Sequence, residues 1–441
     1  MMQTQTDVHL QPVGSSLKVL LIIEQCNPEW PSVPLVGYNF FREIDKRANV
    51  TLVTHERNRN AIAAKGHTNV IYMPESELIR GYYRLFAPLV SKVWQLYHTL
   101  NYPIYAEFNN NVYNAFKDKV QAGAYDIVHV LTPMMPRYPV KLVRACKEVP
   151  FLLGPVNGGV SFPKGFQDVA RREFYYLNVI RHLVRLIPGY VETYKRADHI
   201  LAGSTFTMNM IQEQLHVPDE RISLFYENGI DAAFLETTAV DDLSRASDNC
   251  IELLFVGRLV PYKGADMLLD AISQLPPEIQ QRVHLTIVGD GVERQNLQQQ
   301  QQQLQLGDRV TFVGWVAQQE TLNYYRRADI FCFPSVREFG GAVVLEAMAC
   351  GLPCIVVNNG GIGEYVTPEN GFSIEPISRQ YVVNMLQQHI TDLVLDQDLR
   401  KRLSTQARLR AQEFEWGNKA EQIVREYHRL IEKKLTPRAI Q

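Results

Sequence analysis

Two glutamates, Glu338 and Glu346, stand eight residues apart in the sequence and enclose two adjacent glycines, Gly340 and Gly341. A helix that begins at bare glycines can present backbone N–H groups to an anion such as a phosphate. Carboxylates do not bind phosphate, but they accept hydrogen bonds from hydroxyl groups. A ligand that carries both phosphates and hydroxyl groups is a nucleotide sugar, and this spacing predicts a site for one.

The segment after Gly341 is predicted to be a short helix. It is apolar from Ala342 to Met348, and Gly351 and Pro353 are stop signals for a helix. A tight turn before a core helix would explain the glycines without any ligand. It would not explain Glu346, because a buried charge must find a partner.

Two cations follow another predicted strand. Gly257 opens a loop that contains Arg258 and Lys263. A fork-shaped guanidinium and an ammonium together suit a diphosphate. An isolated pair of this kind is more often a pair of solvated loop charges. The interpretation therefore depends on the neighbouring loops.

Glycine-containing turns follow two more predicted strands. Gly289 and Asp290 come after one strand, and Gly314 comes after the other. In an open α/β sheet, ligands bind at the carboxyl ends of the strands, and glycines let a ligand approach the backbone. A plain turn would also explain Gly289. Backbone groups near Gly314 are predicted to meet a base.

These loops require parallel sheets to position them. Short apolar runs alternate with helical patterns in both halves of the chain, which predicts an α/β fold with sheets buried on both faces. Strands are predicted at 18–23, 50–54, 126–131, 151–153, 199–202 and 222–225, and again at 251–256, 283–288, 310–313, 330–333 and 354–357. Helices are predicted at 266–275, 293–306, 319–327 and 419–433.

Size and composition exclude several classes of protein. A chain of 441 residues is too long for one ordinary core and predicts two domains. A net charge of −2 gives no sign of a nucleic-acid partner. No apolar run approaches the roughly 18 residues of a membrane span, and residues 1–14 lack a signal-peptide core, so we expect a cytoplasmic protein. The six cysteines are scattered, which predicts reduced thiols and no metal site.

The joint order of the motifs closely resembles glycosyltransferase family 4. The ordered motifs are Arg258 with Lys263, Gly289-Asp290-Gly291, Phe312-Val313-Gly314, Glu338 with Glu346, and Gly360-Gly361. The resemblance is strong over residues 251–375 and weaker over 15–235, where residues 199–204 and 227–231 match. It implies the GT-B fold, in which two Rossmann-like domains face each other across a cleft.

The resemblance also implies a division of the chain. Residues 1–14 are expected to form a flexible tail, residues 15–233 the acceptor domain and residues 234–415 the nucleotide-sugar domain. Residues 416–441 are expected to form a helix that crosses back to the first domain. Residues 234–250 are polar and aperiodic, which is typical of a linker.

The activity implied by the resemblance is retaining transfer of a sugar from a UDP-, GDP- or ADP-sugar to a hydroxyl acceptor, without cofactor or metal. Arg258 and Lys263 would then stabilise the diphosphate leaving group. Glu338 would bind hydroxyl groups of the donor sugar, and Glu346 would hold the ribose. The residues expected to line the donor site are Gly257, Gly289, Asp290, Gly314, Phe339, Gly340, Gly341 and Glu346.

Four residues of the first domain are candidates: His129 is expected to be catalytic, together with Arg258, Lys263 and Glu338, and Gly37, Asn157 and Gly158 are candidates for the acceptor side. His129 matches a histidine that the family places near the donor sugar, and a satisfied core histidine is the competing interpretation. Gly37 lies where the family has a glycine pair, although the loop before it is long and rich in proline. Asn157 and Gly158 follow a predicted strand and could line the acceptor or form an ordinary turn.

The expected partners are a nucleotide-sugar donor and a glycan or lipid-linked acceptor, with no nucleic acid. Segments 78–105 and 171–196 are aromatic and basic, and basic amphipathic helices can lie on anionic membranes. Peripheral contact with the inner face of the membrane is therefore a hypothesis. Such aromatic residues more often belong to a core.

Three other functions fit the same plan of two domains. A sugar-nucleotide epimerase would need no acceptor, and a sugar phosphorylase would need a lysine that carries pyridoxal phosphate. A non-catalytic sugar- or nucleotide-binding protein would have little need for Arg258, Lys263 and both glutamates together. The expected product classes of a transferase are exopolysaccharide, lipid-linked glycan or glycolipid.

Overall fold

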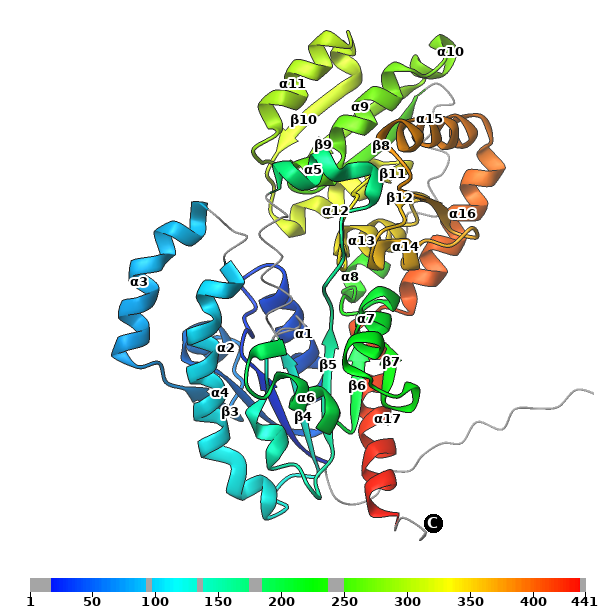
Figure 1. The fold of residues 1–441 in the computed structure, drawn as a ribbon. Helices are drawn as coiled ribbons and strands as arrows, with labels where there is room; N and C mark the ends of the chain where they lie inside the picture. Colours follow the sequence, from blue (N-terminus) through cyan, green and yellow to red (C-terminus); the bar gives the residue numbers. More distant parts are fainter. Residues whose placement is uncertain (1–16, 93–96, 133–137, 174–184, 237–249, 437–441) are drawn as a thin grey trace, which may run out of the picture.

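The protein contains two parallel β-sheets, each covered by helices (Figure 1). The structure is a computed structural model that describes residues 17–92, 97–132, 138–173, 185–236 and 250–436. The first sheet has seven strands in the order β3-β2-β1-β4-β5-β6-β7, and the second has six in the order β10-β9-β8-β11-β12-β13. The predicted α/β class, with sheets buried between helices, is confirmed.

The first sheet takes its strands from the N-terminal half of the chain. These strands are β1 (Lys18–Ile23), β2 (Asn49–His55), β3 (Val70–Met73), β4 (Ile127–Thr132), β5 (Phe151–Val156), β6 (His199–Ala202) and β7 (Ile222–Leu224). The helices between them are α1 (Val33–Asp45), α2 (Arg59–Ala63), α3 (Glu77–Lys92), α4 (Tyr97–Gln121), α5 (Gln167–Arg172), α6 (Tyr190–Arg196) and α7 (Thr205–Leu215).

The second sheet takes its strands from the C-terminal half. These strands are β8 (Ile251–Val256), β9 (Val283–Val288), β10 (Val310–Gly314), β11 (Ile330–Phe333), β12 (Cys354–Val357) and β13 (Gly371–Ile374). The helices are α8 (Ala232–Leu235), α9 (Ala265–Ser273), α10 (Pro277–Gln280), α11 (Arg294–Gln303), α12 (Gln318–Arg327), α13 (Ala342–Ala349), α14 (Gly361–Tyr365), α15 (Arg379–Leu395), α16 (Gln397–Gln412) and α17 (Trp416–Leu435).

Alternation along β1 explains how the first sheet is buried on both faces. Val19, Leu21 and Ile23 pack into a core shared with α1 and α17. Leu20 and Ile22 pack into the other core, which is shared with α4, α6 and α7. Successive side chains of a strand point to opposite faces, so an uninterrupted apolar run fills both cores at once.

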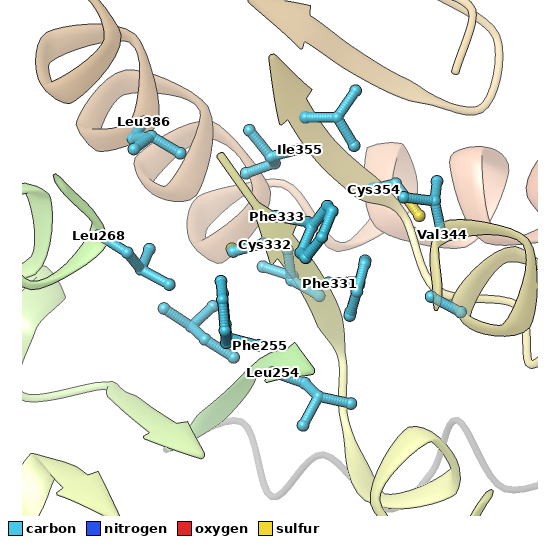
Figure 2. Close-up of a cluster of buried hydrophobic side chains, with 14 of the residues drawn as sticks. Leu254, Phe255, Leu268, Phe331, Cys332, Phe333, Val344, Cys354, Ile355 and Leu386 are labelled. Atoms are coloured by element: carbon cyan, nitrogen blue, oxygen red, sulfur yellow. The ribbon is translucent and has the colours of Figure 1, made fainter. Parts of the chain in front are cut away.

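The core of the second sheet is rich in aromatic residues. Figure 2 shows Phe255 of β8 beside Phe331 and Phe333 of β11, with Leu268 of α9 and Leu386 of α15 nearby. The rings of Phe331 and Phe333 are stacked, with their centroids 5.9 Å apart. This core holds β8 and β11 rigidly side by side, and the two loops that follow these strands start from it.

Two segments of the described chain pack against the sheet of the other half. Helix α17 ends the chain but packs against α1 of the first sheet, where the rings of Trp416 and Phe40 meet with centroids 5.0 Å apart. Helix α5 follows β5 of the first sheet but lies with the second (Figure 1), and Phe162, Phe166 and Ala170 belong to the second core. The boundaries predicted for the domains stay predictions.

Most of the predicted strands match the structure closely, and two strands were not predicted. Strands β1, β6, β8, β9, β11 and β12 have the predicted bounds, whereas β3 and β13 are additions. The predicted tail at 1–14 and most of the predicted linker, residues 237–249, lie outside the described residues. No helix in the described part of the chain is both long enough and apolar enough to cross a membrane.

Candidate functional site

The candidate site forms where β8 and β11 lie side by side. The sheet order changes direction between these two strands, which is the place where open α/β sheets bind ligands. The loop after β8 carries Lys263, and the loop after β11 carries Glu338. These residues are 75 positions apart in sequence, yet the Lys263 ammonium donates a hydrogen bond to the Glu338 carboxylate.

Lys263 is nearly enclosed at this position. Its side chain is 11% exposed, and the ammonium lies 4.8 Å from the centroid of the Phe333 ring. A cation in such surroundings interacts strongly with any negative charge that reaches it. Arg258 is exposed and donates to the hydroxyl of Tyr262 over 3.0 Å. Both predicted cations therefore lie on one loop, and the Lys263 ammonium contacts the Glu338 loop.

The Glu338 loop is fixed against the loop that follows β12. Glu338 and Gly360 form an isolated β-bridge, and the Gly361 amide donates to the carbonyl oxygen of Phe339 over 3.1 Å. Gly341 has φ 50°, and α13 begins directly after it. Within the described residues, no protein acceptor meets the amides of Gly340, Gly341 and Ala342. Amides without a protein acceptor suit an anion, and the predicted role of the amides of Phe339 to Gly341 stays a prediction.

Glu346 is buried on α13 and has found protein partners. Its carboxylate accepts from the Tyr325 hydroxyl over 2.9 Å and from the Gln318 side chain over 3.0 Å. Burial raises the pKa of Glu346, and these two hydrogen bonds oppose the rise. A carboxylate has more than two acceptor positions, so a ribose hydroxyl could still bind. The ribose role stays a prediction.

The predicted glycines at the ends of β8, β9 and β10 bring three backbones close together. The Gly257 amide donates to Val288 over 3.0 Å, and the Gly289 amide donates to Gly314 over 2.8 Å. A Cβ at Gly289 would overlap the carbonyl oxygen of Gly257. Asp290 is used within its own turn, where it accepts from the Gly291 amide over 2.7 Å.

Asn157, from the first sheet, reaches the candidate site. Its side chain donates to the carbonyl oxygen of Phe339 over 3.0 Å, and its own oxygen accepts from Ser204 and Thr207. Gly158 follows directly and donates to Thr207 over 3.1 Å. The structure therefore brings Asn157 to the donor-side loop, whereas the printed bonds of Gly158 stay within the first half.

Two other candidates of the first domain are not brought to this site. His129 is fully buried in β4, where Nδ1 lies 2.6 Å from the Tyr427 hydroxyl and Nε2 lies 2.6 Å from the Gly154 oxygen. Burial lowers its pKa to about 4. Both ring nitrogens are occupied, as in a satisfied core histidine. Gly37 is also explained by packing, because a Cβ there would lie 2.6 Å from the Gln25 oxygen.

Several residues at the site were not predicted as site residues, although residues 227–231 matched the family segment. Glu227 and Asn228 cover Gly340, since a Cβ at Gly340 would overlap both side chains. Arg337 donates to the carbonyl oxygen of Val160 over 3.0 Å. Burial raises the pKa of Glu173, which directly follows α5. The positive charges of Arg337 and Arg258 oppose this rise. All four residues take part in contacts between the two halves of the chain, and no local sequence pattern encodes such contacts.

Glu227 should make stability depend on pH below 7, whereas Lys419 acts above pH 7 and with the opposite sign. Burial raises the pKa of Glu227 from 4.5 to about 7, and burial lowers the pKa of Lys419 to about 7. Between pH 4.5 and 7 the folded protein holds a proton on Glu227 that the unfolded chain has lost. Stability therefore falls as pH rises through this window.

We expect Glu227→Gln to reduce this fall, because glutamine does not titrate. The measurement is the thermal midpoint at a series of pH values from 4.5 to 7. Glu421→Gln is the matched control, since Glu421 is exposed on α17. Equal slopes for Glu227→Gln and the wild-type protein would contradict the assignment.

Comparison with known proteins places the site in context. Residues 242–410 match the family model described as glycosyl transferases group 1. A mannosylfructose-phosphate synthase of Agrobacterium fabrum is 37% identical over 117 residues, which cover 25% of this chain and 26% of that protein. A D-inositol 3-phosphate glycosyltransferase of Stackebrandtia nassauensis is 31% identical over 201 residues, covering 43% of this chain and 44% of that protein.

Solved structures match over nearly the whole chain. A glycosyltransferase from Rickettsia africae has a TM-score of 0.64 and 16% identity, covering 94% of this chain and 99% of its own. Anabaena HepE in complex with UDP has a TM-score of 0.61 and 19% identity, and the match covers 94% of this chain and 100% of the HepE chain. The fold is therefore GT-B, as predicted.

The sequence comparisons support a glycosyltransferase at a coarser level than the sequence motifs predict. The chain spans less than half of the length of the two curated relatives described above. The family match lies in the C-terminal half, which contains Lys263, Glu338 and Glu346. The family match identifies neither the donor nor the acceptor, and it does not give the stereochemistry of transfer.

Proposed function

We propose that this protein transfers a glycosyl group from a nucleoside diphosphate sugar to a hydroxyl group of an acceptor, with retention and without a metal ion. The observation that carries the proposal is the contact between Lys263 and Glu338 beside the amides of residues 340–342, which have no protein acceptor among the described residues. It places an enclosed cation, a carboxylate and a helix N-terminus at one point. A diphosphate suits the cation and the amides, and a sugar hydroxyl suits the carboxylate.

The proposed reaction needs no protein nucleophile. The bond between the anomeric carbon and the diphosphate oxygen breaks, and the acceptor oxygen bonds to the same face of that carbon. The proton of the acceptor hydroxyl passes to the departing phosphate oxygen. Lys263 and Arg258 stabilise the negative charge that grows on the diphosphate, which is commonly the largest contribution to catalysis.

Glu338 has a binding role in this proposal. Its carboxylate already accepts from Lys263, and Ser335 approaches the same oxygen at 3.4 Å. A carboxylate paired with a cation is a weak nucleophile but remains a good acceptor for a sugar hydroxyl. Glu346 is assigned to the ribose and Gly314 to the base. The structures of HepE with UDP and with UDP-glucose support a donor of this class on the same fold.

The test is a panel of UDP-, GDP- and ADP-sugars followed by thermal shift. A donor at 100 times its Kd should stabilise the folded protein by about 2.7 kcal/mol. Nucleotide release and the anomeric configuration of the product are then measured by NMR, with and without EDTA. A panel without any stabilising nucleotide sugar, or an inverted product, would overturn the corresponding part of the proposal.

The same experiment separates the alternatives. An epimerase would convert the donor sugar without releasing nucleotide or needing an acceptor. A phosphorylase would show the absorption of bound pyridoxal phosphate. A non-catalytic binding protein would be stabilised by a nucleotide sugar and would leave it intact. Glu338→Ala with unchanged turnover would remove Glu338 from the site in every case.

A further inference from the structure

One carboxyl group beside the donor-side loop has no part in the proposed reaction. Glu227 follows β7 and is half-buried. A Cβ at Gly340 would lie 2.4 Å from Glu227 Oε1, so the carboxyl group is in contact with the backbone of Gly340. The Gly340 amide is one of the three that the proposed function gives to the diphosphate. A diphosphate bound there would therefore be a close neighbour of the Glu227 carboxyl group.

Contacts between the two halves hold Glu227 in this place. The Asn157 side chain forms a hydrogen bond with the Glu227 carboxyl group and donates another to the carbonyl oxygen of Phe339 over 3.0 Å. Two residues further along, a Cβ at Gly229 would overlap the Trp416 ring. The chain that follows Glu227 is therefore tightly packed, and the carboxyl group cannot turn away from the loop without breaking its contact with Asn157.

Charged and titratable groups face Glu227 from three elements. Lys419 of α17 favours its ionised form, and Glu338 of the donor-side loop opposes that form. Burial and then the charge of Glu227 raise the pKa of Tyr365 on α14, so this phenol stays neutral. Glu338 already accepts a hydrogen bond from Lys263, whose charge is thereby used. Among these groups, Lys419 is the cation on which an ionised Glu227 depends.

Lys419 is poorly placed to keep Glu227 ionised. Its side chain is buried, and its ammonium donates to the carbonyl oxygen of Tyr226 over 2.6 Å and lies 4.2 Å from the centroid of the Phe225 ring. Burial lowers the pKa of Lys419 to about 7. Burial raises the pKa of Glu227 to about 7, against the smaller effects of Asn157 and Lys419. Near neutral pH the free protein therefore contains both forms of Glu227.

We propose that Glu227 takes up a proton when the diphosphate of the donor binds, and that the donor-bound protein holds it as a neutral carboxyl group. A like charge within about 4–6 Å disfavours an ionised group, and the diphosphate of a nucleotide sugar carries a negative charge on each phosphate. The proton comes from the solvent, binds a carboxylate oxygen of Glu227 and returns to the solvent when the diphosphate leaves. The inference rests on the proposed function for the place of the diphosphate, but not for the transfer of the sugar.

This proton uptake makes the affinity for the donor depend on pH. Above pH 7 the free protein must first protonate Glu227, so the donor binds less tightly as pH rises. A diphosphate that is esterified at both ends lacks the ionisation near pH 6 of a terminal phosphate, so the ligand adds little pH dependence of its own. We expect the Kd of the donor to rise about tenfold from pH 6 to pH 8, because most of the free Glu227 loses its proton over this range.

The test is isothermal titration calorimetry on the full chain, with UDP-glucose, GDP-mannose and ADP-glucose as probes and without acceptor. Titrations in HEPES and in Tris give the number of protons taken up, because the two buffers have different ionisation enthalpies. At pH 8 we expect about 0.9 proton per bound probe in the wild-type protein and none in Glu227→Gln. Glu227→Gln should also bind about tenfold more tightly than the wild-type protein at pH 8, and equally at pH 6. Glu421→Gln, exposed on α17, is the matched control and should take up as many protons as the wild-type protein.

The outcomes separate this inference from the proposed function. A probe that binds the wild-type protein without proton uptake overturns the inference, whether or not the variant folds, and leaves the donor site standing. Uptake that persists in Glu227→Gln assigns the proton to another group, such as Lys419, and also overturns the inference. Uptake that is lost in Glu227→Gln supports it even if no acceptor releases nucleotide from the probe, in which case the transfer proposal fails. If none of the probes binds, both are overturned.

Discussion

Lys263→Ala is expected to lower the rate of nucleotide release by about 10²–10³-fold at saturating donor. The ammonium is enclosed beside Phe333 and within contact of Glu338, so water cannot replace it easily when charge develops on the diphosphate. Removal of one comparable donor from a preorganised site typically costs about 2.7–4 kcal/mol. Steady-state release of nucleotide from the donor found in the panel is the measurement.

A second variant separates this loss from misfolding. Lys263→Ala leaves the Glu338 carboxylate without its cation. The Glu338 side chain is only 15% exposed. An unpaired charge in that position is destabilising. Lys263→Ala combined with Glu338→Gln removes both charges and should restore stability without restoring activity. Lys401→Ala, on the exposed side of α16, should behave like the wild-type protein. Release within about threefold of wild type in a folded Lys263→Ala protein would contradict the role.

The strands that build the site could be predicted because each is a nearly unbroken apolar run. β8, β11 and β12 are buried on both faces, β9 is buried on one face and partly exposed on the other, and this burial is what the sequence records. β3 and β13 were missed because they are the outer strands of their sheets. Each has only four residues and is partly exposed, so the apolar pattern is too weak to separate it from a loop.

The site was predictable in its residues but not in its contacts. The order of motifs gave Lys263 and Glu338, yet their contact depends on β8 and β11 being neighbours in the sheet. Sheet order is a property of the whole domain, and no local spacing encodes it. The hydrogen bond from Asn157 to Phe339 depends further on how the two halves are placed. The position of His129 in a predicted strand likewise could not show that both ring nitrogens contact protein groups, the Tyr427 hydroxyl and the Gly154 carbonyl oxygen.

Gly360→Ala should be the most damaging single-methyl change near the site. Gly360 has φ 99°, where a side chain is strained, and a Cβ would overlap the carbonyl oxygen of Glu338. Both atoms belong to backbone that is bridged at this point, so neither can move without displacing the Glu338 loop. We expect turnover to fall about 100-fold, because a displacement near 1 Å at a catalytic group costs this much.

Gly307→Ala is the matched control for that change. Gly307 also has a positive φ, of 51°, but a Cβ there would meet open space. Its cost is limited to the left-handed backbone, about 1–2 kcal/mol, with donor affinity and turnover unchanged. The comparison isolates the steric part of the effect, since both variants add one methyl group at a glycine of positive φ. Equal losses of thermal stability and equal turnover in the two variants would mean that the bridge between Glu338 and Gly360 does not position the Glu338 carboxylate.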